Sequence, residues 1–421
     1  MKTIPLLSLS LLVVTGSLPA ARADECRTDI NPALQYFQSF LVAPQPMAAA
    51  DMDYFNSKEG RSKKLPDRFG GIVAGYDNQF RLLHQAAHAT VPCDWGLDFC
   101  VGINAFLPHL ARAKAATQAA QVRAVWELQH GQPAAAREDL AAVFVLARNA
   151  SRDGTIIGTM VEFANEAIIN ATIAQNFGQF PPEILQGLAD DFAAAPPAGI
   201  LATSIPGEKK YVHDWLMEKI LKTQQLYPGD DRKVMEMIRP EYELISTSQT
   251  FFGGKEDTNL WSRIVTAAGG TSDGVLNLLR DNGPLYARLA TLMALPAAEF
   301  NSQAVAFNAE IKGSTNPLTQ VLFPFPNIRR SREFRSQANG AMVRAAMEYK
   351  LHGDAGLQSV SDPFGHGPFH CERFVFKGVD RGFKLTSAYD GLGYPCAMIF
   401  VEKTGPAFVI EGPHLGEAVT Q

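Results

Sequence analysis

Apolar residues recur three and four positions apart through most of the first three quarters of the chain, which is the spacing of amphipathic helices. Between about Asn31 and Gly313 this pattern is interrupted at intervals by Pro or Gly, the residues that most often end a helix. We therefore expect a mainly α-helical protein, built either as an antiparallel helical bundle or as an irregular array of helical hairpins.

Start and stop signals define the individual helices. Strong helix formers fill the segment between Ala105 and His130 and predict one long helix there. Gly131 and Pro133 then supply a stop and a start, which predicts a return helix over 134–149. Further helices are expected over 155–177, between the proline pairs at 181–182 and 196–197, from Pro206 onward, and over 330–351.

The pattern changes after Gly313, where Pro and Gly become frequent and short β-type runs follow the last helix. We expect these runs to form a small C-terminal antiparallel β region. The predicted strands are 373–377, 383–386, 397–401 and 407–410. The expected organisation is a leader over 1–23, a helical domain over 24–313, a linker over 314–329, and a helix with the small sheet over 330–421.

The first 23 residues have the features of a secretory signal peptide. Lys2 precedes an apolar stretch over 4–14, and Ala21-Arg22-Ala23 places small residues at the cleavage positions. We therefore expect an exported protein, periplasmic or secreted. Beyond this leader no apolar run approaches the roughly 20 residues that a membrane-spanning helix needs, so we expect no transmembrane segment in the mature chain.

The charge balance disfavours nucleic acid as a partner. The sequence has 38 Lys and Arg against 43 Asp and Glu, and removal of a leader that contains Lys2 and Arg22 makes this balance more acidic. Proteins that bind duplexes depend instead on basic side chains that neutralise phosphates. We expect a protein or another envelope macromolecule as the partner. A basic group at the start of the late helix is expected to be a solvated face and consists of Arg329, Arg330, Arg332 and Arg335.

Export would place the five cysteines in a compartment where disulfides persist. Cys93 and Cys100 flank a short loop that contains Gly96, and Cys371 and Cys396 flank the expected sheet. We expect these two pairs to form disulfides and Cys26 to stay free. Other pairings remain open, because connectivity does not follow from sequence alone.

Two groups of residues are candidate metal ligands. His84 and His88 stand one helical turn apart, as in zinc-dependent proteases, but Gln85 occupies the position of the catalytic Glu. Surface histidines without a metal are the simpler interpretation, so we expect no cofactor and retain zinc as the metal to test. The second group lies in a loop rich in Gly and Pro, next to Cys371, and consists of Asp362, His366 and His370.

Glu162 and Glu166 stand one turn apart on the helix predicted over 155–177. Paired carboxylates can perform acid–base chemistry or bridge two metals, but the Glu-x-x-His pairs of a di-iron bundle are missing from the helical region. We therefore expect a solvated polar stripe. The sequence also lacks a nucleophile elbow, a phosphate-binding loop and a dinucleotide fingerprint, so catalysis of those types is not predicted.

Two resemblances to known proteins add to this picture. The run over 139–148, followed by Gly154-Thr155-Ile156-Ile157-Gly158, is similar to uncharacterised exported helical proteins of bacteria, which have no assigned activity. Segments 347–353, 362–365 and 383–391 resemble the helix-then-sheet tail of type II secretion major pseudopilins.

In the pseudopilin family an Asp-Pro-aromatic-Gly motif begins the sheet, and a Ser-x-x-Asp-Gly loop helps to bind calcium. The resemblance therefore implies that Asp390 is a calcium ligand. A pseudopilin also begins with a long apolar helix, whereas a long helical region precedes the tail of this chain. The resemblance thus implies a tail that has been reused as a covering module.

These observations favour an exported soluble protein that is not an enzyme, namely a helical binding or scaffold protein of the cell envelope. The alternative is a metal-dependent hydrolase that uses His366 and His370, or His84 and His88.

Overall fold

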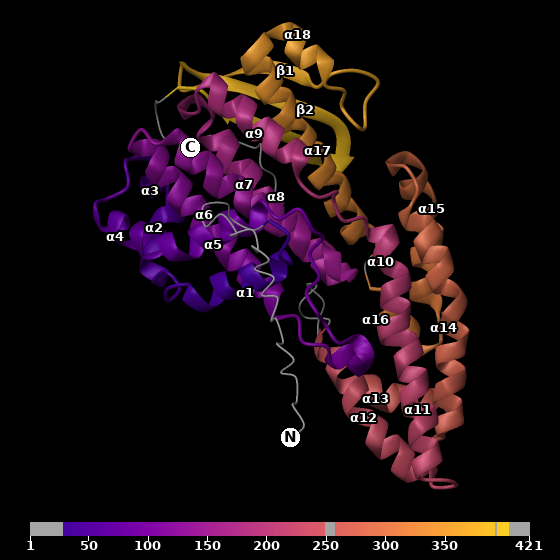
Figure 1. Cartoon of the computed structure of the whole chain (residues 1–421). Helices are drawn as coiled ribbons and strands as arrows, with labels where there is room; N and C mark the ends of the chain where they lie inside the picture. The colour runs from indigo at the N-terminus through magenta and orange to yellow at the C-terminus, as the bar shows by residue number, and fades with distance from the viewer. Residues whose placement is uncertain (1–27, 249–256, 325, 392–393, 404–421) are drawn as a thin grey trace, which may run out of the picture.

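The computed structural model describes residues 28–248, 257–324, 326–391 and 394–403. Within them the protein is mainly α-helical and carries a small three-stranded antiparallel sheet near its C-terminal end, which confirms the predicted fold class. Figure 1 shows a broad helical body, the sheet at one end of it, and an arm of long helices beside it. The leader over 1–23, Cys26 and the strand predicted over 407–410 lie outside the described residues.

The helical body consists of helices that pack against their neighbours in the chain. The predicted hairpin is formed by α6 (Pro108–Gln129) and α7 (Pro133–Ala150), and Gly131 turns the chain with a φ of +73°. α8 (Ile156–Gln175) follows and begins where the Thr155 hydroxyl accepts a hydrogen bond from the Gly158 N–H. The other helices of the body are α1 (Pro32–Val42), α2 (Ala49–Asn56), α3 (Lys58–Ser62), α4 (Arg68–Gly75), α5 (Asp77–Ala87) and α9 (Pro182–Ala194).

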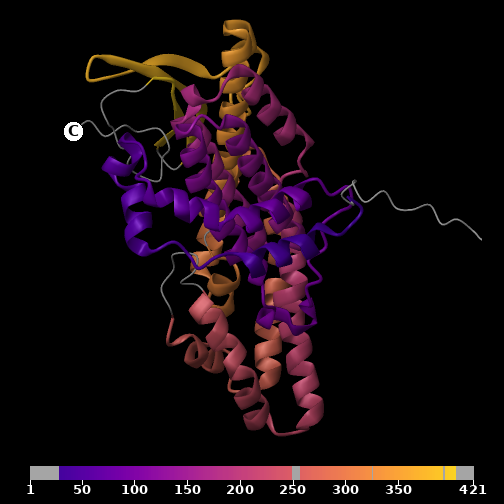
Figure 2. The same ribbon diagram turned by 60° about the vertical axis from the view of Figure 1, so that its left-hand side comes forward.

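The arm begins with a continuous helical run that we expected to start at Pro206. Instead α10 (Leu201–Glu208) contains Pro206, and a π-helical turn over Lys209–Asp214 joins it to α11 (Trp215–Leu226). The helix continues through the proline because Leu201 and Ile205 are buried, and α10 packs against α14. The remaining arm helices, which Figure 2 shows extending away from the sheet, are α12 (Asp231–Ser248), α13 (Leu260–Ala267), α14 (Ser272–Met293), α15 (Ala297–Gly313) and α16 (Pro317–Leu322).

The predicted linker over 314–329 contains α16 and the first residues of α17 (Pro326–His352). Asn316 caps α16 and also donates a hydrogen bond to the carbonyl of Leu278 on α14, at 2.7 Å. One contiguous apolar core extends from α1 to the sheet and includes residues of the arm, so this segment packs rather than separating two cores. Among the described residues no helix is both long enough and apolar enough to cross a membrane.

The sheet has the strand order β1-β2-β3 and covers one end of the body (Figure 1). Its inner side buries Phe383 and Phe400, whose rings stack with centroids 5.1 Å apart. The strands contact α17 and α8, and Phe177 meets Phe400 edge to face. The elements of this region are α18 (Asp354–Ser359), β1 (His370–Phe376), β2 (Val379–Gly391) and β3 (Tyr394–Val401).

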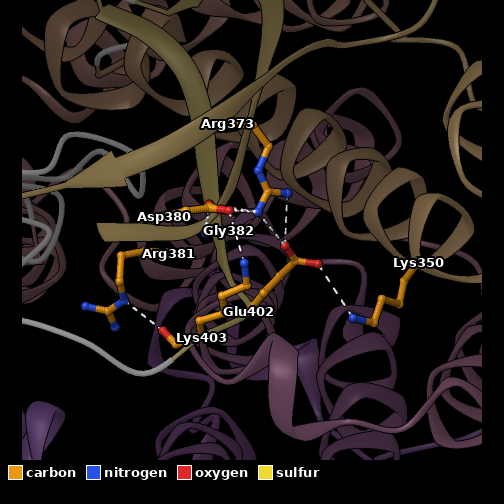
Figure 3. A network of polar contacts seen from close by, with 7 residues as sticks. All are labelled: Lys350, Arg373, Asp380, Arg381, Gly382, Glu402 and Lys403. Atoms are coloured by element: carbon orange, nitrogen blue, oxygen red, sulfur yellow. Dashed lines mark hydrogen bonds and ion pairs between the residues drawn. The ribbon is translucent and has the colours of Figure 1, made fainter. Parts of the chain in front are cut away.

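Ion pairs fasten the end of β3 to β1, β2 and α17, as Figure 3 shows. Arg373 pairs with Asp380 at 2.8 Å and with Glu402 at 3.0 Å, and Lys403 also reaches Asp380 at 3.1 Å. Lys350 of α17 lies 3.6 Å from Glu402. Because these side chains are partly exposed to water, each pair stabilises the fold only weakly.

The two predicted disulfides are not formed, since all four described cysteines are free. Cys371 lies on β1 and Cys396 on β3, with β2 between them. Two strand spacings separate such backbones by about 10 Å, whereas a disulfide needs Cα atoms within roughly 7 Å. In the other pair Cys93 is buried and Cys100 is exposed.

Candidate functional site

A cavity of 550 Å³ lies between α7, α8, α9 and α17, and we call it the α8–α17 cavity. Most of its wall is apolar. Polar side chains from three helices join this wall, namely Arg148 of α7, Glu166 and Asn170 of α8, and Ser336 of α17. An apolar cavity with a few convergent polar groups is the usual form of a ligand site. The larger apolar side chains are Phe144, Phe163, Phe192, Ile200, Met347 and Pro363.

Glu166 lines the polar end of this cavity, and Glu162 lies one turn before it on α8; their side chains are only 4% and 0% exposed. The expectation of a solvated stripe is therefore wrong. The reason is that α8 is a central helix: α6, α7, α10, α17 and β3 pack against it and enclose the side that carries both acids, whereas the side around Ala164 reaches water. The sequence did contain a signal of this burial, because apolar residues occur on every side of the helix that carries the two acids.

One guanidinium serves both buried carboxylates. Arg148 Nε lies 2.5 Å from Glu166 Oε1 and 3.6 Å from Glu162 Oε1. The Gly199 N–H donates to both oxygens of Glu162 at 3.0 Å, and the Ser336 hydroxyl donates to Glu166 Oε2 at 2.9 Å. Two acids and one base leave a net negative charge if both acids are ionised, which a buried site tolerates poorly.

Burial is the main cause of the altered acidity of this pair. It raises the pKa of Glu162 to about 7, with a further contribution from the nearby Glu166. Burial also raises the pKa of Glu166, although Arg148 acts in the opposite direction. The pair therefore retains a proton near neutral pH and can donate or accept one there.

A third buried acid, Glu333 of α17, lines the same cavity. It forms an ion pair with Arg330, which is itself buried and donates to the carbonyl of Leu295 at 3.0 Å. Burial raises the pKa of Glu333. The expectation that this basic group is a solvated face is thus wrong for Arg330. Arg344, by contrast, is exposed and lines the same cavity.

The two histidines considered as candidate zinc ligands, His84 and His88, border a different space, a polar groove of 570 Å³. His84 is oriented by a buried acid, because its Nε2 lies 2.8 Å from Asp139 Oδ1. The other oxygen of Asp139 accepts from Arg123 Nε at 2.6 Å. His88 stands just past the end of α5 and is exposed. The Asp139–Arg123 network that holds His84 was not foreseen from the sequence.

The second predicted group has been separated by the fold. The Asp362 carboxylate accepts from the Ser387 hydroxyl at 2.8 Å and from the Ala388 N–H at 2.6 Å, which ties the loop before β1 to β2. His370 begins β1 and its side chain is 72% exposed. No set of three or more His, Cys, Asp or Glu side chains in the described ranges is arranged to hold a metal ion. His366 is exposed in the same loop, and Asp390 is exposed on β2.

The residues that the sequence analysis missed are those that complete the cavity. Arg148 and Ser336 are 188 positions apart in the chain, and both reach Glu166 because α17 packs against α8 and α9. Neither residue belongs to a motif. No known protein family, characterised protein or solved structure matches this chain, so the arguments for its function come from the cavity itself.

Proposed function

We propose that this is a non-catalytic, exported binding protein of the cell envelope, and that the α8–α17 cavity receives an apolar group that ends in an amine. One observation carries the proposal: Glu166, a buried carboxylate that lines an apolar cavity, shares a single guanidinium with a second buried carboxylate, Glu162. The signal-peptide pattern of residues 1–23 supports export.

The charge of the pair favours a cation over an anion. When an ammonium enters, it can form an ion pair with Glu166 and release the proton that the two acids otherwise share. The aromatic wall is compatible with positive charge, because the Arg148 guanidinium already lies over the Phe144 ring at 4.8 Å, and Phe192 stacks on Phe144 with centroids 4.0 Å apart. A volume of 550 Å³ is in the range of cavities that hold small molecules or a protruding side chain.

Calorimetric titration of the purified protein with n-hexylamine and with n-hexanol tests the proposal. We expect the amine to bind more tightly by about tenfold, because only the amine forms the charge-assisted hydrogen bonds. Glu166→Gln should remove that preference, while Glu138→Gln, a change on an exposed side chain of α7, should leave it intact. Equal binding of the two probes, or a preference that survives Glu166→Gln, would overturn the proposal.

The metal-dependent hydrolase has less support. The Asp362 carboxylate already accepts three hydrogen bonds that hold its loop, and His370 projects into solvent. Elemental analysis of the purified protein distinguishes the two proposals. Stoichiometric zinc that disappears in His84→Ala or in His366→Ala would establish a metal site and favour the hydrolase.

A further inference from the structure

A second cavity, of 230 Å³, lies where the arm meets the body and shares no lining residue with the α8–α17 cavity. The body contributes the segment around 99–107, the start of α8 and the start of α17. The arm contributes α10, α12, α14 and α16, and we call the space the arm–body cavity. Its apolar lining includes Ile103, Leu107, Ile156, Val212, Leu244 and Leu322.

Three polar side chains from three helices also line this cavity: Glu208, Tyr286 and Arg329. Tyr286 is only 2% exposed, and its hydroxyl has no hydrogen-bond partner among the described residues. A buried hydroxyl without a partner destabilises a protein, so such a group is expected to have a use. Glu208 and Arg329 interact electrostatically with each other and with Tyr286.

The protonation states of these three side chains decide which of them can donate a hydrogen bond into the cavity. Burial raises the pKa of Glu208, which favours its neutral acid form. Burial and the proximity of Glu208 raise the pKa of the Tyr286 hydroxyl well above its usual value, so Tyr286 keeps its proton. Arg329 is cationic at any ordinary pH. Asp153 and Asp214 also act on Glu208 and Tyr286. The groups that can donate to a negatively charged acceptor here are therefore the Tyr286 hydroxyl and the Arg329 guanidinium.

The wall beside these groups includes an unusual element. Tyr211 and Val212 belong to the π-helical turn over Lys209–Asp214, a rare conformation that is found frequently at functional sites. Phe99 stacks on Tyr211 with centroids 4.2 Å apart and holds the body segment against this turn. This part of the wall is thus formed before any ligand enters.

From the unpartnered Tyr286 hydroxyl, the cation of Arg329 and the apolar walls, we infer that the arm–body cavity binds a small monocarboxylate with an apolar body. The carboxylate would accept hydrogen bonds from Tyr286 and Arg329, and the apolar part would lie against the lining of α8, α12 and α16. A medium-chain aliphatic acid has this chemistry.

Titration with octanoate and octanol tests the inference, and the chain offers a matched control. Tyr286→Phe removes only the hydroxyl at the cavity. Tyr242→Phe removes another buried hydroxyl without a partner, which lies in the arm but outside the cavity lining. We expect octanoate to bind more tightly than octanol, and Tyr286→Phe to weaken octanoate binding about tenfold while Tyr242→Phe leaves it unchanged.

Stability measurements separate a binding role from a structural one. Neither phenylalanine variant should lower the melting temperature of the free protein, because each loses only an unpartnered hydroxyl. Octanoate that binds no better than octanol, or equal effects of the two variants on octanoate affinity, would overturn the inference. Glu166→Gln should not alter octanoate binding, so a failure of the amine site and a failure of this site are distinguishable.

Discussion

At the scale of single residues, burial changes what a charged side chain can do. Glu162 and Glu166 have the spacing of an ordinary polar stripe, yet both are enclosed by other helices. Enclosure raises the pKa of Glu162 to about 7 and makes this acid a group that titrates near neutral pH. On an exposed helix, two glutamates with the same i, i+4 spacing would have pKa values close to those of free side chains.

The raised pKa of Glu162 predicts a particular dependence of stability on pH. The folded protein holds a proton on this pair that the unfolded chain releases above about pH 4.5, so the contribution of the pair to stability is largest at low pH. It is lost as the pH rises from about 4.5 through 7, by on the order of 3 kcal/mol.

Urea unfolding of the wild type and of Glu162→Gln at several pH values measures this effect. Other groups titrate in the same range, so the difference between the two proteins is the relevant quantity. We expect the wild type to lose stability relative to the variant as the pH rises. Parallel curves would contradict the assignment of the proton to this pair.

At the scale of secondary-structure elements, the sequence predicted well the helix ends that depend on local start and stop signals. The ends of α6 and α7 lie within a few residues of prediction, because Gly131 and Pro133 are strong local stop and start signals. Prediction failed where contacts between distant parts of the chain determine the structure. α10 continues through Pro206 because it packs against α14, and α16, within the predicted linker over 314–329, is also attached to α14 through Asn316.

The candidate site was predicted least well, for a related reason. The polar side chains of the α8–α17 cavity come from α7, α8 and α17, and nothing local in the sequence indicates that Ser336 reaches Glu166. The sequence suggested Asp362 as a candidate metal ligand, whereas its contacts with Ser387 and Ala388, which join the loop before β1 to β2, follow only from the packing of the strands.

Because the Asp362 carboxylate joins the loop before β1 to β2, we expect its removal to lower the stability of the folded protein. Asp362→Ala leaves the Ser387 hydroxyl and the Ala388 N–H without their acceptor, which should cost about 1–3 kcal/mol. Asp390→Ala, a change on an exposed side chain of the same sheet, should stay within about 0.5 kcal/mol. Thermal unfolding compares them, and equal effects would show that the Asp362 carboxylate does not hold the loop.

At the scale of the whole molecule, body, arm and sheet share one contiguous core. The two views of the ribbon separate the arm from the body visually, yet α10 and α15 both contact α17. A shared core predicts that the arm does not unfold on its own. The parts of a protein that unfold together are those that share a packed core, whatever the outline of the ribbon suggests.

Single-tryptophan variants can check this cooperativity. Trp95 lies in the core of the body, and Trp261 packs beside Tyr242 in the arm. With the other tryptophans replaced by Phe, we expect the two probes to report the same denaturation midpoint. An arm probe that melts clearly earlier than the body probe would contradict a single unit.

α17 gives this arrangement a mechanical consequence. It is 27 residues long, a rod of about 40 Å, and it carries Arg329 at one cavity, Glu333 and Ser336 at the other, and Lys350 beside the sheet. A hydrogen-bonded helix resists compression, so a sliding movement that shifts Arg329 also displaces Ser336. If an occupant of one cavity shifts α17 along its axis, we expect the affinity of the other cavity for its own ligand to change, and thermodynamic reciprocity makes the effect equal in both directions.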